Sequence, residues 1–150
     1  MRTLVKIRGL PGSGTSTLAR AMLIGYNIGF LYKKPRGAHF EVDMYHMDAH
    51  GNYNYTAAHD HAADTWCQLQ TTNAMKENVN LIIVSNNFTR IWELEPYDQL
   101  AAVYGYETQE IICKGNFRSH HHADQLERMR KYFQYRPLEY VIGPHHTDAE

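Results

Sequence analysis

Short apolar segments alternate with amphipathic ones along the chain. Strand-like patterns occur at Thr3–Arg8, Ala38–Val42, Val79–Val84 and Glu107–Cys113. The segment Val79–Val84 (VNLIIV) is an apolar run, which is typical of a strand buried on both faces of a parallel sheet. Helical spacing of apolar residues predicts helices over Ser16–Ile24, Thr56–Glu77, Trp92–Tyr104 and Ala123–Tyr135.

Individual residues add detail to three of these helices. Gly25 predicts the end of the first helix, and Pro137 closes the last one. The second helix has Ala62, Trp66, Leu69, Asn73 and Lys76 at helical steps. The last helix carries an apolar stripe formed by Leu126, Met129 and Phe133. The segment 26–37 has no clear pattern, and 43–54 reads as a polar loop.

The strand–helix alternation predicts an α/β fold. We expect a mostly parallel sheet of four or five strands with helices on both faces, in three layers. A length of 150 residues fits one domain, which we assign to residues 1–136, with a C-terminal tail at 137–150. Ligands of such sheets bind beyond the carboxyl ends of the strands. The glycine loop after the first strand, Asp43 and Ser85–Thr89 should therefore meet at one rim.

Composition narrows the classes of function. Hydrophobic residues make up 43% of the chain and charged residues 21%, which is ordinary for a globular protein. Fifteen basic residues against 16 acidic ones argue against a general nucleic-acid coat, although a local basic groove remains open. The chain lacks an apolar run long enough for a membrane span, and its first residues lack a secretory signal. Cys67 and Cys113 have no metal or redox spacing, so we expect a cytoplasmic protein without a membrane partner.

The chemistry-bearing motif is the glycine loop. It reads GLPGSGTST from Gly9 to Thr17 and nearly matches the Walker A pattern G-x-x-x-x-G-K-[ST]. Glycines let the backbone N–H groups wrap a phosphate, and the following helix points its positive end at the same place. Ser16 stands where the Mg²⁺-binding hydroxyl belongs. The predicted nucleotide-binding residues are Gly9, Pro11, Gly12, Ser13, Gly14, Thr15, Ser16 and Thr17.

Thr15 occupies the position of the Walker A lysine. That lysine normally places a positive charge against the β- and γ-phosphates, and threonine supplies none. Three interpretations are open: a simple glycine-rich turn, a nucleotide-binding module with weak or no catalysis, and a working kinase that uses another cation. The sequence alone does not separate the last two.

Four segments in order resemble the polynucleotide-kinase-like P-loop kinases, including small phage and bacterial proteins labelled AAA-family ATPase or predicted kinase. They are Arg8–Gly14, Asp43–Tyr45, Ser85–Thr89 and Leu126–Met129. The resemblance covers residues 3–134 and implies a P-loop NTPase fold. It also implies transfer of the ATP γ-phosphate, with Mg²⁺, to a hydroxyl acceptor, typically a nucleic-acid 5′-OH.

The same resemblance assigns roles to individual residues. Asp43 matches the general base for the acceptor hydroxyl, and Arg128 matches the arginine of the lid helix. Arg118 falls in the lid loop. His46, Asn86 and Thr89 are candidates for the acceptor side. Met44 replaces a second acid and Ser85 an aspartate of the family, so both changes remove charge from the site.

Other features have competing explanations. Asp43 is also a plausible cap or turn residue. Tyr45, Tyr53 and Tyr55 could stack bases or simply pack. His59–His61, the histidine run 120–122 and the basic residues near Arg128 could bind metal or phosphate, or form a solvated surface. A nucleic-acid binder that uses the tyrosines and the basic helix is a third hypothesis, after kinase and nucleotide-binding module.

Overall fold

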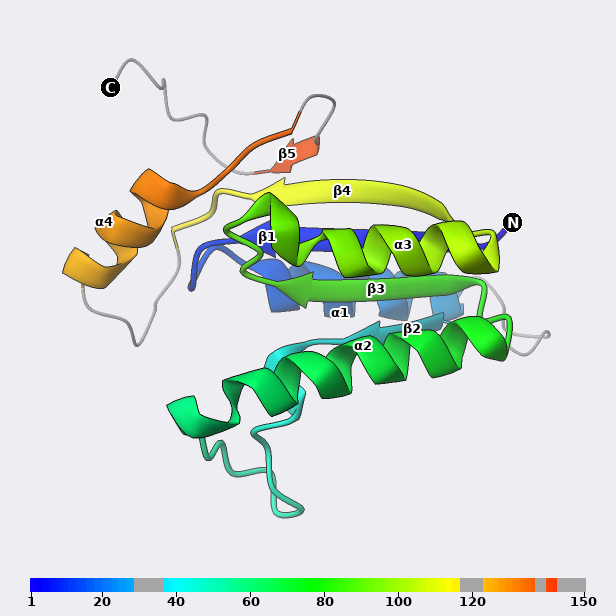
Figure 1. Cartoon of the computed structure of the whole chain (residues 1–150), viewed down its shortest axis with the longest axis horizontal. Coiled ribbons are helices and arrows are strands. Elements are labelled where there is room, and N and C mark those ends of the chain that lie inside the picture. The colour runs from blue at the N-terminus through cyan, green and yellow to red at the C-terminus, as the bar shows by residue number, and fades with distance from the viewer. Residues whose placement is uncertain (29–36, 117–122, 137–139, 143–150) are drawn as a thin grey trace.

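The fold is a five-stranded parallel sheet between two layers of helices. The computed structural model describes residues 1–28, 37–116, 123–136 and 140–142. The strand order is β2-β3-β1-β4-β5, and every neighbouring pair is parallel (Figure 1). The strands are β1 (Thr3–Gly9), β2 (Gly37–Phe40), β3 (Leu81–Asn86), β4 (Glu107–Cys113) and β5 (Tyr140–Ile142). This architecture confirms the predicted α/β fold class.

Each face of the sheet has its own apolar core. The helix α1 (Thr15–Ile28) packs on one face against Val5, Ile7 and Ile83. The helices α2 (Asp60–Lys76) and α3 (Glu95–Tyr104) pack on the other face against Leu4, Ile82 and Val84. Neighbouring residues of β3 thus point into opposite cores, so the strand is buried on both sides. This burial on both faces is the reason predicted from the sequence for its apolar run.

The helix boundaries differ from the predictions at four places. The helix α1 does not end at Gly25 but continues to Ile28, because a glycine inside a helix lowers stability without stopping it. Short 3₁₀ helices precede α2 at Ala57–His59 and α3 at Ile91–Glu93. The helix α4 covers Ala123–Tyr132 and ends three residues before the predicted Tyr135, because Gln134 N donates to Thr89 O.

The buried face of α2 consists of Ala63, Cys67, Thr71, Ala74 and Met75. Leu69, one of the residues at helical steps that predicted this helix, is 53% exposed. Small side chains bring this face close to the sheet. The hydroxyl of Thr71 donates to the backbone oxygen of Cys67 at 2.8 Å, which removes the penalty for burying it.

The segment after α4 returns to the sheet. β5 pairs with β4 inside the stretch predicted as a tail, and the boundary at residue 136 stays a prediction. In Figure 1, α4 lies at the edge to which the strand arrows point. None of the helices in the described ranges has the length and apolar character needed to cross a membrane.

Candidate active site at the carboxyl edge of the sheet

The glycine loop joins β1 to α1 at this edge. Gly12 and Gly14 have φ angles of 81° and 101°, a backbone conformation that glycine adopts readily. The first helical hydrogen bond runs from Leu18 N to Gly14 O. The amides of the residues at the start of α1 therefore lie outside the helical ladder and are suited to bind an anion.

Gly9 lies at the floor of the loop, where no side chain fits. A Cβ atom there would lie 2.3 Å from Ser13 Oγ and 2.6 Å from the backbone oxygen of Cys113. Ser13 is 5% exposed, and its hydroxyl has no hydrogen-bond partner among the described residues. The loop thus has the backbone geometry of a phosphate cradle and holds a buried hydroxyl beside it.

Glu41, which sequence analysis did not single out, joins the loop to β2 and β3. Its carboxylate accepts hydrogen bonds from the Ser16 hydroxyl at 2.5 Å and from the Ser85 hydroxyl at 2.9 Å. His39 Nε2 lies 2.6 Å from Ser85 Oγ and 3.6 Å from Glu41. Burial lowers the pKa of His39, Glu41 opposes that shift, and Arg20 reinforces it. A strand-end acid two residues before Asp43 was the available signal in the sequence.

Asp43 lies in a 3₁₀ helix (Val42–Met44) directly after β2, and is exposed. The hydroxyl of Tyr53 donates to Asp43 Oδ1 at 3.1 Å. Burial raises the pKa of Tyr53 to about 12, and the charge of Asp43 and this hydrogen bond add to the shift. The carboxylate is therefore held by a side chain from the far end of its own loop. It sits inside the turn, and Glu41 holds the N-cap position instead.

An aromatic cluster surrounds His46 next to Asp43. The rings of Tyr53 and Tyr55 are stacked at 6.3 Å, and His46 meets Tyr55 edge-on at 5.0 Å. Tyr45, Tyr53 and Tyr55 are 37%, 53% and 51% exposed, so they pack on one another and still offer ring surface to solvent. His46 is 5% exposed, which makes it a buried support of the cluster rather than an open acceptor-side group.

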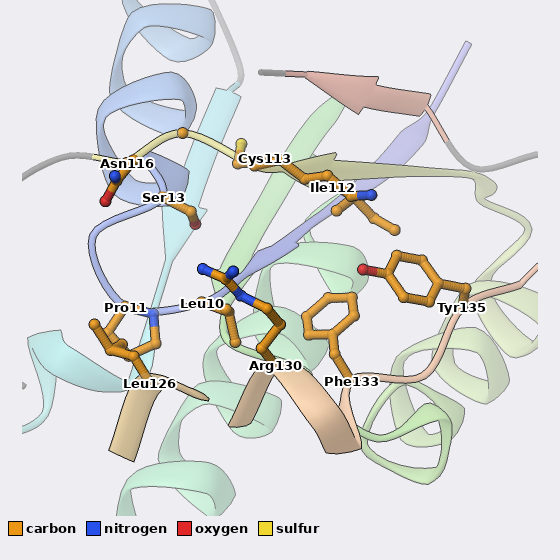
Figure 2. Close-up of a pocket in the computed structure, with 12 residues that line it drawn as sticks. Leu10, Pro11, Ser13, Ile112, Cys113, Asn116, Leu126, Arg130, Phe133 and Tyr135 are labelled. Atoms are coloured by element: carbon orange, nitrogen blue, oxygen red, sulfur yellow. The ribbon is translucent and has the colours of Figure 1, made fainter. Parts of the chain in front are cut away.

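A pocket lies on the α4 side of the glycine loop (Figure 2). It is lined by the loop, the end of β4, α4 and the residues after α4. Arg130 points into this pocket, toward Leu10 and Ser13, and Lys114 lines it as well. Arg128, the arginine predicted from the sequence, is exposed on α4 and does not line the pocket. Arg118 and the histidine run 120–122 lie outside the described residues.

A second pocket lies beyond the end of β3. Its polar lining residues are Asp64, Gln68, Asn86, Asn87 and Glu93. Burial raises the pKa of Asp64, and the charges of Glu93 and Asp60 contribute. Of the acceptor-side candidates, Asn86 lines this pocket, whereas Thr89 is turned to Glu93 at 3.5 Å. Trp92, also in the lining, is 66% exposed and offers an apolar surface at the pocket mouth.

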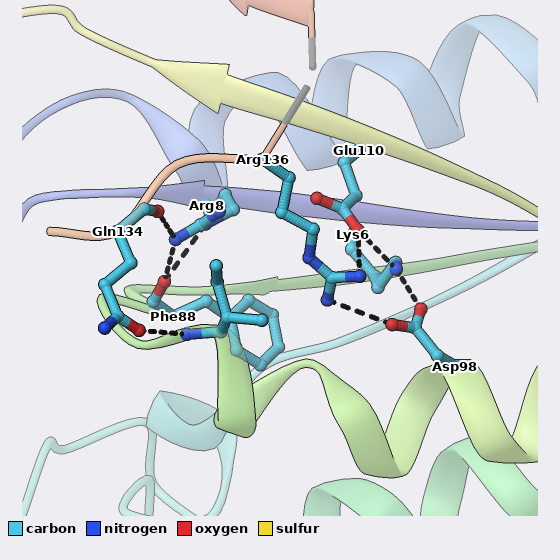
Figure 3. A network of polar contacts seen from close by, with 8 residues as sticks. Lys6, Arg8, Phe88, Asp98, Glu110, Gln134 and Arg136 are labelled. Carbon is cyan, nitrogen blue, oxygen red and sulfur yellow. Dashed lines mark hydrogen bonds and ion pairs between the residues drawn. The ribbon is translucent and has the colours of Figure 1, made fainter. Parts of the chain in front are cut away.

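Two buried cations of β1 anchor the segment behind α4 (Figure 3). Arg8 donates to the backbone oxygens of Phe88 and Gln134, and its guanidinium lies 4.5 Å from the ring centroid of Phe133. Lys6 pairs with Asp98 and Glu110, the carboxylates that also hold Arg136. These contacts fix the base of α4 beside the glycine loop, so that Arg130 faces the pocket.

Segments that were predicted to meet at one edge of the sheet do lie there. The glycine loop, Asp43 and Asn86 lie on loops at one edge, and Asn86 Oδ1 accepts from Val42 N at 2.9 Å. Among the described residues no group of three or more His, Cys, Asp or Glu side chains could hold a metal ion, and this includes His59–His61. The hydroxyl of Ser16 and the carboxylate of Glu41 are oxygen ligands of the kind that Mg²⁺ takes together with phosphates and water.

Comparison with known proteins bears on the fold. No protein-family model matches it. Human NEDD4-binding protein 2 is 31% identical over 104 residues, which are 69% of this chain but 5% of that much longer protein. The chain therefore corresponds to a small part of that relative.

Solved structures match more of the chain. APS kinase CysC from Mycobacterium tuberculosis, in complex with AMPPNP and APS, is 17% identical with a TM-score of 0.50, covering 85% of this chain and 67% of that one. A chain of the Pnkp1/Rnl/Hen1 RNA repair complex is 15% identical with a TM-score of 0.55, covering 95% and 50%. The resemblance to P-loop kinases is confirmed, and the chain has their fold.

Proposed function

We propose that this chain is a P-loop phosphotransferase that binds ATP with Mg²⁺ and transfers the γ-phosphoryl group to an acceptor hydroxyl. The observation that carries the proposal is the glycine loop, with two left-handed glycines ahead of the amino end of α1 and the Ser16 hydroxyl beside it. Within the Gly9–Thr17 loop, the backbone amides at the start of α1 would hold the phosphates. Bound Mg²⁺ would neutralise charge on the β- and γ-phosphates, with Ser16 as a ligand.

The acceptor hydroxyl would approach from the pocket beyond β3. Asp43 would take its proton as the acceptor oxygen bonds to the γ-phosphorus, while the bond from that phosphorus to the bridging oxygen of ADP breaks. Tyr53 would orient the Asp43 carboxylate through its hydrogen bond. Asn86, which holds the backbone of Val42, would keep the turn with Asp43 in place.

The missing lysine leaves a need for positive charge, and two cations beside the loop are candidates to supply it. Arg130 and Lys114 line the pocket that borders the loop. The Arg130 side chain is 58% exposed and makes one loose ion pair, at 4.0 Å with Glu127, so it can move toward a phosphate. We propose Arg130 as the compensating cation, with Arg128 and Arg118 as the lid arginines implied by the resemblance.

The acceptor is a hydroxyl compound, and a nucleic-acid 5′-OH is one candidate. The partly exposed tyrosines beside Asp43 favour an acceptor with a ring that can stack on them. The carboxylates of Asp64 and Glu93 disfavour phosphate groups inside the acceptor pocket. The acceptors tested should therefore include uncharged nucleosides and sugars as well as oligonucleotides.

Transfer of the labelled phosphoryl group from radiolabelled ATP is the direct test of the proposed activity. The purified chain with γ-labelled ATP and Mg²⁺ should label at least one acceptor among 5′-OH DNA, 5′-OH RNA, nucleosides and sugars. Thr15→Lys should raise the rate, because it restores the charge that the loop lacks, by about 10²-fold.

Thr15 in place of the Walker A lysine also favours a second function, a nucleotide-binding module without turnover. Calorimetry distinguishes the two, since a module binds ATP but yields no labelled product with any acceptor, even as Thr15→Lys. A chain that does not bind ATP at all would contradict both proposals.

A further inference from the structure

The carboxylate of Glu41 lies at a meeting point of the loop and two strands. It is 8% exposed and accepts hydrogen bonds from Ser16 of the glycine loop and Ser85 of β3. The Ser85 hydroxyl donates its only hydrogen to Glu41. In the contact between His39 Nε2 and Ser85 Oγ, His39 is therefore the donor. The carboxylate is thus held in one position by groups from three different segments.

Such a buried carboxylate conflicts with binding a bare triphosphate. Its hydrogen-bond donors in the described part of the chain are the hydroxyls of Ser16 and Ser85, which carry no charge to balance it. It is bonded to the second residue of α1, the end that would bind the phosphates. A carboxylate there repels phosphate unless a divalent cation lies between them.

We infer that Glu41, which directly follows β2, is the metal-positioning acid of this site, in place of the family's aspartate at the position of Ser85. This inference rests on the proposed function. The hydrogen bond from Ser16 to Glu41 turns the hydroxyl hydrogen away and leaves the oxygen lone pairs for Mg²⁺. The distance of 2.9 Å between Ser85 Oγ and Glu41 Oε2 means that an acid on either strand reaches nearly the same point.

The inference predicts that Glu41→Gln affects ATP affinity differently with and without metal. In EDTA, Glu41→Gln should bind ATP as tightly as the wild type or more tightly, because the repulsion is gone. With Mg²⁺, the wild type should gain affinity and Glu41→Gln should lose most of that gain, about 10- to 100-fold. Isothermal titration calorimetry measures both affinities. Electron paramagnetic resonance of Mn²⁺ in the ATP complex reports the metal directly.

Relocating the acid separates this role from a structural one. Glu41→Gln combined with Ser85→Asp should restore the Mg²⁺-dependent gain, since the charge returns from the neighbouring strand. Glu95→Gln, which removes an exposed carboxylate from α3, serves as the matched control and should change nothing. If Glu41→Gln does not fold, Ser16→Ala tests the same arrangement and should also lose the gain.

Two results would overturn the inference. One is a full Mg²⁺-dependent gain in Glu41→Gln. The other is an equal loss of ATP affinity with and without metal, which is the mark of a purely structural role. Both leave ATP binding by the wild type intact and so do not touch the proposed function, whereas a wild type without ATP binding would contradict the nucleotide site itself.

Discussion

The guanidinium of Arg8 donates a hydrogen bond of 2.5 Å to the backbone oxygen of Gln134, which lies 126 positions later in the chain. Arg8 is the penultimate residue of β1, and Gln134 follows α4. The contact therefore ties the strand that leads into the glycine loop to the helix that carries Arg130. This contact explains why a basic residue, Arg8, lies inside a central parallel strand: it joins two parts of the site.

Removing Arg8 should destabilise the fold. Arg8 is fully buried and serves two backbone oxygens, Phe88 O and Gln134 O, so Arg8→Met would leave both without this donor. We expect the free energy of unfolding to fall by about 3 kcal/mol, measured by urea denaturation. Arg128→Met on the exposed side of α4 is the control and should stay within about 0.5 kcal/mol of the wild type. Equal stabilities of the two variants would contradict the anchoring role.

Two glycines should respond to alanine in opposite directions. Gly9→Ala places a Cβ 2.6 Å from the backbone oxygen of Cys113, which cannot easily move, so it should weaken ATP binding at least about 10-fold and lower stability by about 1–3 kcal/mol. Gly25→Ala meets nothing within 4 Å inside α1 and should raise stability by about 0.5–1 kcal/mol. Calorimetry with ATP and thermal denaturation check both variants. An unchanged ATP affinity in Gly9→Ala would show that the loop tolerates a different backbone.

The two arginines of α4, Arg128 and Arg130, should differ in their effect on phosphoryl transfer. Arg130 faces the pocket beside the loop, so Arg130→Ala should lower the rate of phosphoryl transfer about 10²- to 10³-fold. Arg128→Ala should have a much smaller effect, because its side chain is exposed. Rate measurements at saturating ATP separate the two. The reverse order would favour the assignment made from the resemblance over the one made from the pocket.

The pKa of Tyr53 offers a test of the Asp43 contact that needs no substrate. The pKa of about 12 lies above the ordinary value of 10.0, so the folded state favours the neutral phenol. The resulting stability is complete below pH 10 and is lost as the pH rises toward 12. Asp43→Asn removes the charge contribution and should lower this pKa while burial keeps it above 10.0. Nuclear magnetic resonance of ¹³C-labelled tyrosine follows the titration, and an unchanged pKa in Asp43→Asn would mean that the contact is absent in solution.

The sequence by itself determined the fold class and the glycine loop. The apolar run of β3 and the exact bounds of β4 follow from local pattern, since a strand buried on both faces must be apolar on both. The motif from Gly9 to Thr17 is equally local, because the backbone geometry it needs is encoded by its own glycines. These features depend on neighbours in the sequence, so they could be predicted.

Only the tertiary structure decided which polar residues meet. The face that α2 buries depends on what Cys67 and Met75 can pack against, which periodicity alone does not show. Glu41 became part of the site because β2 lies next to β3 and brings it to Ser85 and Ser16. Arg130 faces the loop because Arg8 holds the end of α4 from across the chain. Such long-range neighbours are fixed by strand order and packing, which no local pattern contains.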